Sequence, residues 1–338
     1  MPETPEQSPQ QTPAQPNPTP QPADALSEEE RASRTARPSF DSMALGRTPG
    51  QRGAEILAGL RAELMNTPEA AALSRLSGRI VARIIRSLLG GNPSGINFVL
   101  ARLYTNKELI RRALPPDNQP ATVVEVAAGF SPRGFEMARE HPHTQIIEVD
   151  LPDVVEEKQK RLRRARNLEA LPPNLSWLSA DLGVTPLAEV LSRGQVDVIV
   201  AEGLLAYFTP AETLYILSGF RASLKPGGVL LADIPRRQGM LDAQSQSGLR
   251  MFSRQAGSFV NIAASEEAAG QQFLDAGYTD VTVDYASQMA ELLGLPTPVL
   301  DFAYFVAGRS MSADATADAP TESAAADTNS APDQPRAE

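Results

Sequence analysis

From residue 122 to residue 234 the chain repeats one pattern, in which a short apolar, often β-branched run is followed by a segment of helical length. Parallel strands need crossover connections of this size, and strands buried on both faces read as continuous apolar runs. The five runs therefore predict a doubly wound parallel sheet with helices on both faces, including helices near 132–140, 153–168 and 209–223. The runs are TVVEVAA, TQIIEVD, LSWLSAD, VDVIVAE and GVLLADI.

The pattern differs on the two sides of this segment. After a helix near 264–276, DVTVDYA and VLDFAYFVAGR are two more strand-like runs with a helix-sized stretch between them. Residues 53–90 and about 96–114 instead place apolar residues three and four apart, which indicates helices. We therefore expect an α/β fold with a doubly wound, mostly parallel sheet of seven strands and an N-terminal helical cap.

Composition divides the chain of 338 residues into four parts. Residues 1–40 are rich in Pro and Gln, and residues 311–338 are mostly Ala, Asp, Thr, Ser and Pro. Neither segment can bury enough apolar surface to offset the entropy lost on ordering, so both tails are expected to be disordered. Between them we place the helical cap at 41–118 and the sheet-containing core at 119–310.

The acidic charge of the chain lies in its tails. The total of −10 consists of −6 in residues 1–30, −5 in residues 311–338 and +1 in the middle. Nucleic-acid binding needs a basic surface, so no nucleic acid is expected as a partner. The basic run KQKRLRRAR at 158–166 follows two glutamates at helical spacing and is interpreted as a solvated helix face.

Localisation is predicted from what the sequence lacks. No stretch reaches the roughly 18 apolar residues of a membrane span, and the N-terminus has no apolar block typical of a secretory signal. A soluble, cytoplasmic protein without a membrane partner is expected. The chain contains no cysteine, which excludes a disulfide framework, a thiol nucleophile and a thiolate metal site, and no metal site is predicted.

The turn after the first strand is a candidate ligand site, because ligands of such sheets bind beyond the carboxyl ends of the strands. Gly129 lets the backbone approach a ligand, while Ser131 and Pro132 are placed to begin a helix with its free N–H groups in the crevice. Ala127 stands where a fuller motif has glycine, which a ligand site tolerates if its φ is negative. Alone, the turn fits a cofactor site and an ordinary strand–helix junction equally well.

Polar residues at the next three strand ends favour a nucleoside ligand. Asp150 closes the second strand about 20 residues beyond the turn, where a carboxylate can bind the two ribose hydroxyls or cap the next helix. Asp181 and Leu182 follow the third strand and suit the amine and a ring nitrogen of adenine. Glu202 adds a third carboxylate at the end of the fourth strand.

These segments resemble the class I S-adenosylmethionine-dependent methyltransferases, and within them the leucine carboxyl methyltransferase and polyketide O-methyltransferase group. The resemblance covers about 95–235 well and the rest to 310 loosely, and it implies S-adenosyl-L-methionine as cofactor. It also implies that Arg102, on the last helix before the sheet, holds the methionine carboxylate. The remaining donor-binding residues that it implies are Gly129, Asp150, Asp181, Leu182 and Glu202. The segments that carry it are VVEVAAGFSPRG, IIEVDLPDVVEEK, SADL, VAEGLLAYF and SLKPGGVLLADIPR.

The acceptor of the methyl group is predicted from the lack of a base. Transfer from a sulfonium is a one-step in-line displacement, and a hydroxyl acceptor needs a base to take its proton. Both histidines, His141 and His143, precede the second strand and so lie at the opposite end of the sheet. A carboxylate is already ionised at neutral pH, so we predict O-methylation of a carboxylate on a small molecule or a peptide C-terminus.

Recognition of a carboxylate calls for arginine, whose planar fork matches two oxygens. Arg237 follows the fifth strand and Arg254 lies in the next segment, so both are predicted to hold the acceptor. Tyr207 is placed to donate a hydrogen bond to it, although a tyrosine here can equally serve packing. An apolar acceptor pocket is predicted from Met251, Phe252 and Phe259.

Two other functions fit the same residues. One is an O-methyltransferase that acts on a phenol or hydroxyl of a polyketide-like metabolite, with an Asp or Glu as base. The other is an S-adenosylmethionine-binding protein that catalyses no reaction. A nicotinamide-dependent dehydrogenase fits less well, because the turn lacks a close G-x-G-x-x-G motif.

Overall fold

A computed structural model describes residues 49–89, 93–116, 119–166, 168, 170–191, 193–244 and 259–311. All of them belong to one compact unit, Ser39–Glu338. The tails predicted to be disordered lie outside the described residues, except Met311.

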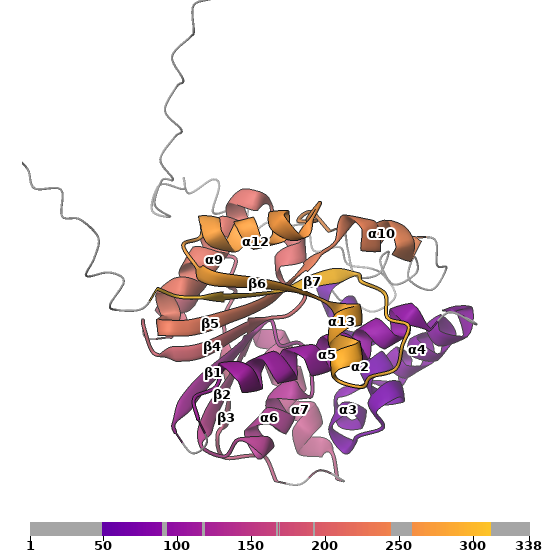
Figure 1. Ribbon diagram of the computed structural model, residues 1–338. Helices are drawn as coiled ribbons and strands as arrows, with labels where there is room; N and C mark the ends of the chain where they lie inside the picture. The colour runs from indigo at the N-terminus through magenta and orange to yellow at the C-terminus, as the bar shows by residue number, and fades with distance from the viewer. Residues whose placement is uncertain are drawn as a thin grey trace, which may run out of the picture. The chain divides into compact units, whose positions relative to one another are not determined.

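A seven-stranded sheet forms the centre of the fold, with strand order β3-β2-β1-β4-β5-β7-β6 (Figure 1). Strands β1 to β5 pair in parallel, and β7 runs antiparallel to both of its neighbours. This confirms the predicted α/β fold with a mostly parallel sheet. The strands are β1 (Ala121–Val126), β2 (Thr144–Asp150), β3 (Leu175–Ser179), β4 (Val196–Ala201), β5 (Leu224–Pro235), β6 (Thr279–Tyr285) and β7 (Ala303–Arg309).

Helices cover both faces of the sheet, because alternate residues of the buried strands point to opposite sides. Val123 and Val198 belong to the apolar core on one face, and Val124 and Ile199 to the core on the other. The first face is covered by α5 (Ser94–Ala113), α6 (Arg133–Glu140), α7 (Pro152–Arg164) and α13 (Ala286–Leu292). The second is covered by α8 (Leu187–Val190), α9 (Pro210–Ser223) and α12 (Glu266–Asp275). The shorter elements η2 (Leu205–Tyr207) and α10 (Arg237–Gln244) follow β4 and β5.

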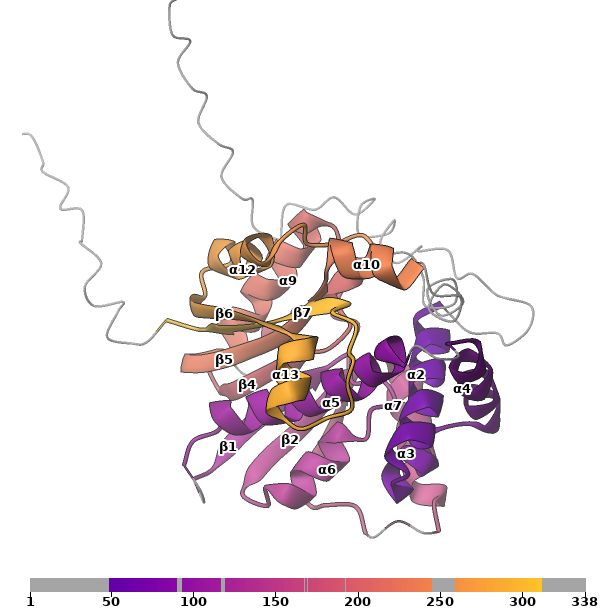
Figure 2. The ribbon, with the colours of Figure 1, turned by 45° about the vertical axis from the view of Figure 1, so that its right-hand side comes forward.

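The segment before α5 folds into three helices, α2 (Pro49–Met65), α3 (Pro68–Leu73) and α4 (Leu76–Leu89). Figure 2 shows them together beside the sheet, with α4 on the outer side of α2. Two glycines allow α2 and α4 to pack closely, since a Cβ on Gly59 would lie only 2.3 Å from the carbonyl oxygen of Gly78. Their shared apolar core contains Ile56, Leu60, Ala82, Ile85, Ile96 and Val99.

The basic run at the end of α7 is only partly a solvated face, which corrects the interpretation above. Lys158 is buried and donates to Glu148 at 2.8 Å. Arg161 is also buried, forms an ion pair with Glu55 of α2, and lies over the ring of Phe130 at 3.9 Å from its centroid. Burial is tolerated because each cation has a carboxylate partner. Part of the run therefore joins the helical cap to the sheet domain.

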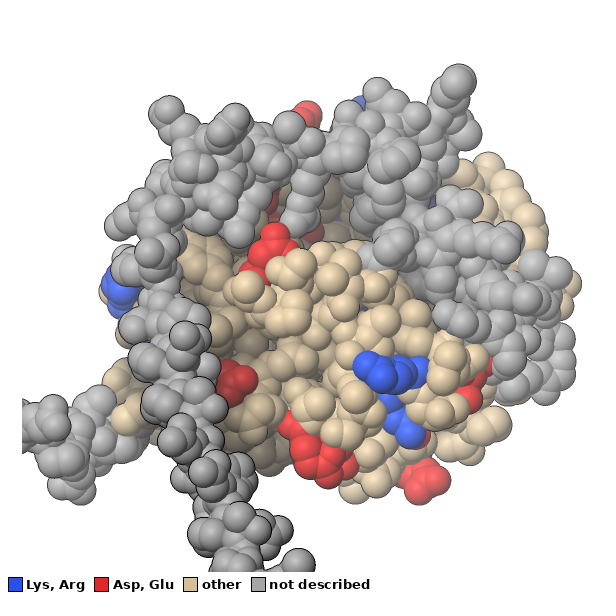
Figure 3. All heavy atoms as spheres, turned by 90° about the horizontal axis from the view of Figure 1, so that it is seen from above, with Lys and Arg blue, Asp and Glu red and all other residues tan. Residues whose placement is uncertain are grey.

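The described residues on the face seen from above in Figure 3 carry charges of both signs. Figure 3, which views the molecule from above, shows lysine and arginine side chains in small groups among acidic and uncharged residues. Among the described helices, none combines the length and the apolar character that crossing a membrane requires. No group of three or more His, Asp or Glu in the described part of the chain is arranged to hold a metal ion.

Candidate active site

The carboxyl ends of β1, β2, β3 and β4 lie along one edge of the sheet, because these strands are parallel neighbours. Asp150 at the end of β2 accepts hydrogen bonds from the backbone N–H of Gly129 at 2.6 Å and of Leu151 at 2.7 Å. Burial raises the pKa of Asp150, and these two amide donors partly offset the effect. The structure thus brings together two of the residues predicted to bind the donor.

The turn between β1 and α6 lies next to helix α2 of the helical cap. Gly129 has a φ of 51°, and a Cβ added to it would lie 3.6 Å from the Cβ of Ala54 on α2. The helix begins at Arg133, with Pro132 as its N-cap, so Ser131 and Pro132 precede the helix rather than forming its first turn. The Ser131 hydroxyl instead accepts from the backbone N–H of Arg133 at 3.3 Å.

The backbone at Ala127 does not have the negative φ that the sequence analysis required for an alanine in a ligand-binding turn. Its φ is 52°, in the left-handed region that a residue with a Cβ rarely adopts. The turn therefore keeps the backbone conformation of a glycine at this position, and the alanine carries a local strain of about 1 kcal/mol.

Replacing Ala127 by glycine is expected to stabilise the protein by about 0.5–1.5 kcal/mol, because the strain is removed. The matched control is Ala128→Gly, at the next position, where φ is not positive and glycine is expected to destabilise by about 0.5–1 kcal/mol. Urea denaturation of both variants measures the difference. Equal effects of the two substitutions would show that Ala127 is not strained.

Glu202, at the end of β4, is the centre of a buried group of charges. It forms ion pairs with Arg61 of α2 at 2.5 Å, with Nε of Arg102 on α5 at 3.1 Å and with Arg133 of α6. Asn106 of α5 also donates to it at 3.3 Å. Four elements far apart in the sequence therefore meet at this one carboxylate.

Two further carboxylates complete the group. Arg133 bridges Glu202 and Glu125, which lies in the middle of β1 and is 1% exposed. Arg102 reaches Asp233 of β5 at 3.3 Å, and Asp233 also accepts from the backbone N–H of Gly203 at 2.5 Å. We call these residues the buried ion-pair cluster. Its members are Arg61, Arg102, Glu125, Arg133, Glu202 and Asp233.

The cluster shifts the pKa values of its carboxylates in opposite directions. Burial alone would raise the pKa of Glu202, but Arg102, Arg133 and Arg61 outweigh it and hold the pKa below its ordinary value. For Asp233 burial prevails, and the pKa is raised despite Arg102, with the nearby charge of Glu202 adding to the rise. Glu202 is thus a firmly ionised carboxylate and a poor base, whereas Asp233 binds a proton more readily than an ordinary aspartate.

Asp181 and Leu182 lie just past β3 at the same edge of the sheet. Ala180 donates its backbone N–H to the carbonyl of Asp150 at 2.9 Å, which fixes the start of this turn next to β2. The Asp181 carboxylate accepts from the N–H of Gly183 at 2.9 Å, within its own turn, and Asp181 is exposed. Its role toward an adenine stays a prediction.

An aromatic wall stands beside the cluster. Tyr207 packs against Phe259, with ring centroids 5.4 Å apart, and Phe259 contacts Phe302, which in turn contacts Phe98. The Arg102 guanidinium lies 5.8 Å from the centroid of the Phe98 ring. Burial raises the pKa of the Tyr207 hydroxyl, so this group stays protonated and can act as a hydrogen-bond donor.

The predicted acceptor-binding arginines are only partly described. Arg237 is the first residue of α10 and is exposed, and its guanidinium has no partner within the described parts of the chain. Arg254, Met251 and Phe252 lie outside the described residues. Of the predicted apolar pocket, Phe259 is therefore the member whose contacts the structure shows.

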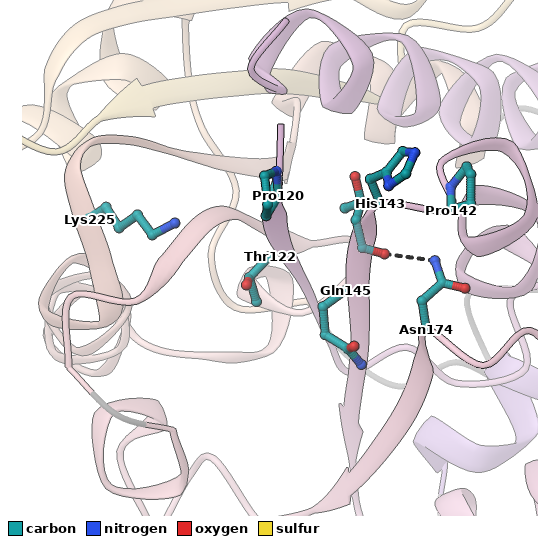
Figure 4. Close-up of a pocket in the computed structure, with 9 residues that line it drawn as sticks. Pro120, Thr122, Pro142, His143, Gln145, Asn174 and Lys225 are labelled. Carbon is teal, nitrogen blue, oxygen red and sulfur yellow. Dashed lines mark hydrogen bonds between the residues drawn. The ribbon is translucent and has the colours of Figure 1, made fainter. Parts of the chain in front are cut away.

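The two histidines lie away from this site, as the sequence predicted. His143 lines a pocket of about 300 Å³ at the amino ends of β1 and β2, together with Thr122, Gln145, Asn174 and Lys225 (Figure 4). This is the opposite end of the sheet from Asp150 and Glu202. Neither histidine is placed to serve as a base at the carboxyl edge.

Sequence reasoning missed Arg61, Arg133 and Asp233. A signal existed for Arg133, because Glu125 interrupts an apolar strand and a carboxylate in such a place needs a cationic partner. Asp233 likewise interrupts the apolar run of β5. Arg61 had no such signal, since it lies 141 residues from Glu202 in an ordinary amphipathic helix.

Comparison with known proteins agrees with this geometry. Residues 78–220, which run from the first turn of α4 to the last turn of α9 and contain Asp150, Asp181 and Glu202, match the family model described as leucine carboxyl methyltransferase. This stretch of the chain is therefore similar to the leucine carboxyl methyltransferase family. This confirms the predicted relationship to class I S-adenosylmethionine-dependent methyltransferases, and with it the class of enzyme and S-adenosyl-L-methionine as the cofactor of that class.

Individual relatives of this methyltransferase-type chain are distant. The malonyl-(acyl-carrier protein) O-methyltransferase of Xylella fastidiosa strain M23 is 27% identical over 118 residues, which span 35% of this chain and 36% of that protein. The chain thus matches about a third of the length of this curated relative. A putative methyltransferase from Thermobifida fusca YX has 15% identity and a TM-score of 0.48 over 77% of this chain and 94% of that structure. Human N-acetylserotonin methyltransferase in complex with SAM has 14% identity and a TM-score of 0.44, over 72% of this chain and 70% of that structure.

Proposed function

We propose that this protein transfers the methyl group of S-adenosyl-L-methionine to a carboxylate of a small molecule or a peptide C-terminus. The observation that carries the proposal is the match of residues 78–220 to the leucine carboxyl methyltransferase family. The curated relative is named for O-methylation of a malonyl group, which also carries a free carboxylate. Both names support the proposal of a carboxylate acceptor.

The charged groups at the carboxyl edge support an acceptor that needs no base. Glu202 is held in its ionised form by three arginines, and a carboxylate with so low a pKa takes up a proton poorly. Both histidines are at the other end of the sheet. A carboxylate acceptor arrives ionised, so the transfer depends on position alone.

The residues present fit the donor. Nε of Arg61 is buried and has no hydrogen-bond partner among the described residues, and Nε of Arg102 lies 3.1 Å from Glu202 without forming a hydrogen bond to it. An incoming carboxylate, such as that of the donor's methionine part, would satisfy the Arg61 group and contact the Arg102 guanidinium. Asp150, fixed by two backbone amides, would accept from the ribose hydroxyls, while Asp181 and Leu182 would face the adenine.

The donor supplies a methyl group on a positively charged sulfur, and in-line attack by an acceptor oxygen breaks the carbon–sulfur bond. Tyr207 would orient the acceptor by donating a hydrogen bond, and the wall formed with Phe259 and Phe302 would exclude water. Arg237 and Arg254 would bind the second acceptor oxygen or another acidic group of the acceptor.

One observation favours a second candidate, an O-methyltransferase for a hydroxyl or phenol. Asp233 lies near the end of β5, and burial raises its pKa, which is the change that suits a carboxylate to act as a base. Against this, both of its oxygens already accept hydrogen bonds, one from Gly203 and the other from Arg102. A non-catalytic donor-binding protein is the third possibility.

Labelled S-adenosyl-L-methionine tests the proposal in two steps. Saturable binding to the full chain is expected first, with Arg102→Met abolishing it and Arg112→Met, at the exposed end of the same helix, leaving it unchanged. Transfer is then measured onto a peptide with a free C-terminal carboxylate, the same peptide amidated, and a malonyl thioester. The labelled product should form on a carboxylate and should release methanol in mild alkali, as an ester does.

Each alternative predicts a different result. A product that resists alkali would be an ether and would support the hydroxyl acceptor with Asp233 as base. Binding without transfer to any acceptor would support a non-catalytic protein. Absence of saturable donor binding would reject all three.

A further inference from the structure

Helix α4 presents an apolar ridge to solvent. Leu76, Ile80 and Ile84 are 72%, 48% and 47% exposed, and their spacing of four residues places them along one side of the helix. The opposite side, with Ala82 and Ile85, is buried against the cap. Single exposed apolar residues are common on protein surfaces, but three in a continuous row over two turns indicate an interaction surface.

Arginines line one flank of this ridge. Arg79, Arg83 and Arg86 follow the apolar positions at spacings that place them together on the side of Leu76. Arg83 pairs with Glu63 at 3.0 Å, and the three arginines together lower the pKa of Glu63, with the hydrogen bond from Arg83 as the main cause. Arg86 acts on Glu63 only at longer range and forms no direct ion pair among the described residues. The flank thus carries a net positive charge of about two.

We infer that this surface, the α4 ridge of Leu76, Ile80 and Ile84 with its arginine flank, binds an acidic amphipathic helix of a partner protein. A row of side chains four residues apart fits the groove of a second helix lying alongside. The arginines on one flank would pair with carboxylates on the matching side of that helix, which fixes its direction and register. The contact is about two helical turns long, since Leu76 and Ile84 lie about 12 Å apart along the axis.

The charge pattern disfavours two other occupants. A second copy packed antiparallel on the same face would place Arg79, Arg83 and Arg86 against the same arginines, and like charges facing each other disfavour such a two-fold contact. A membrane-binding helix carries cations on both sides of its apolar face, whereas α4 has Ser77 and Val81, and no cation, on the side beyond Ile84.

The ridge lies one helix away from the active site. Helix α4 packs on α2 at the close contact of Gly59 with Gly78, and α2 supplies Arg61 to Glu202. Figures 1 and 2 both show α2 between α4 and the sheet. A partner bound on α4 would therefore sit beside the helices that cover the site, where it could deliver an acceptor. Binding itself does not depend on the methyltransferase activity.

Fluorescence anisotropy on the full chain tests the inference directly. The probe is a labelled helical peptide with leucine at every fourth position and glutamates on one flank, compared with a scrambled peptide of the same composition. The patterned peptide should bind at least about tenfold more tightly than the scrambled one, and added salt should weaken it. Equal binding of the two peptides would overturn the inference.

Variants locate the binding surface. Ile80→Ser with Ile84→Ser should weaken binding about tenfold, whereas Leu292→Ser, which alters an equally exposed leucine on α13, should not change it. The double substitution Arg83→Glu with Arg86→Glu should abolish binding of the acidic peptide. It should create binding of a peptide in which lysines replace the glutamates. Arg163→Glu with Arg164→Glu, on α7, changes the net charge equally and should do neither. Circular dichroism of each variant confirms that it is folded.

The other occupants give distinct results. Binding to phosphatidylglycerol vesicles that Ile80→Ser with Ile84→Ser abolishes, without binding of the peptide, would assign the ridge to a membrane. A dimer in analytical ultracentrifugation that the same substitutions dissociate would assign it to a second copy. Peptide binding that appears only after removal of residues 1–40 or 312–338 would assign it to the chain's own acidic tails. Each of these outcomes would overturn the inference.

Discussion

Replacing Glu202 by glutamine is expected to destabilise the protein by about 3–5 kcal/mol, because it leaves buried guanidinium groups without their shared counter-ion. Three arginines pair with this carboxylate, and their side chains are at most 11% exposed. Only Glu125 and Asp233 would remain to balance them. Urea denaturation measures the change in the free energy of unfolding. Donor binding should be lost as well, since the arginines would no longer be held in place.

The control for this substitution is Glu108→Gln. Glu108 pairs with Arg112 on the exposed side of α5, and such surface pairs contribute about 0–1 kcal/mol. Combining Glu202→Gln with Arg61→Met restores the balance of charges and should recover part of the lost stability. A loss below about 1 kcal/mol for Glu202→Gln alone would show that the buried ion-pair cluster does not stabilise the fold.

The same carboxylate predicts a pH dependence. Its folded-state pKa lies below the ordinary value of 4.5, so its pairing stabilises the folded state fully above that value. This contribution is lost as the pH falls from about 4.5 toward the lower folded-state pKa. The difference in stability between the wild type and Glu202→Gln should therefore shrink on acidification below pH 4.5 and stay constant above pH 6. A difference that grows on acidification would contradict the assignment.

Most of the sheet could be predicted from the sequence, because a strand buried on both faces has to be apolar throughout its length. The prediction for TQIIEVD matches β2 (Thr144–Asp150) residue for residue, and the other strands differ mainly at their ends. The parallel arrangement then follows from the helical length of each connection. This is also why the meeting of Gly129 and Asp150 at one edge was predictable.

The buried ion-pair cluster could not be predicted in the same way. Its contacts join residues that lie 69, 131 and 141 positions apart, and no local pattern specifies which arginine will be buried. Arg133 follows a turn and precedes a glycine, as many surface residues do, yet it is 2% exposed. The positive φ of Ala127 could not be predicted from the sequence either, because an alanine rarely adopts it and only the turn imposes it.

Asp150→Asn is expected to weaken binding of S-adenosyl-L-methionine about 5–150-fold, which corresponds to about 1–3 kcal/mol. An asparagine keeps one acceptor oxygen, so it can serve either the Gly129 amide or the Leu151 amide but not both as the carboxylate does. It also has no charge with which to strengthen hydrogen bonds from the ribose hydroxyls. Isothermal titration calorimetry with S-adenosyl-L-methionine and S-adenosyl-L-homocysteine measures the loss, which should be similar for both ligands because they share the ribose.

The matched control is Asp153→Asn, three residues later in the first turn of α7, which should leave both affinities within about twofold because it lies in the helix beyond the strand end. Thermal unfolding without ligand separates the two effects of Asp150→Asn. A loose turn would lower both stability and affinity, whereas loss of the ribose contact alone would lower affinity and leave stability nearly intact. Unchanged affinity in Asp150→Asn would mean that the donor does not lie at this edge of the sheet, and the proposed catalytic roles of Tyr207 and Arg237 would then be lost as well.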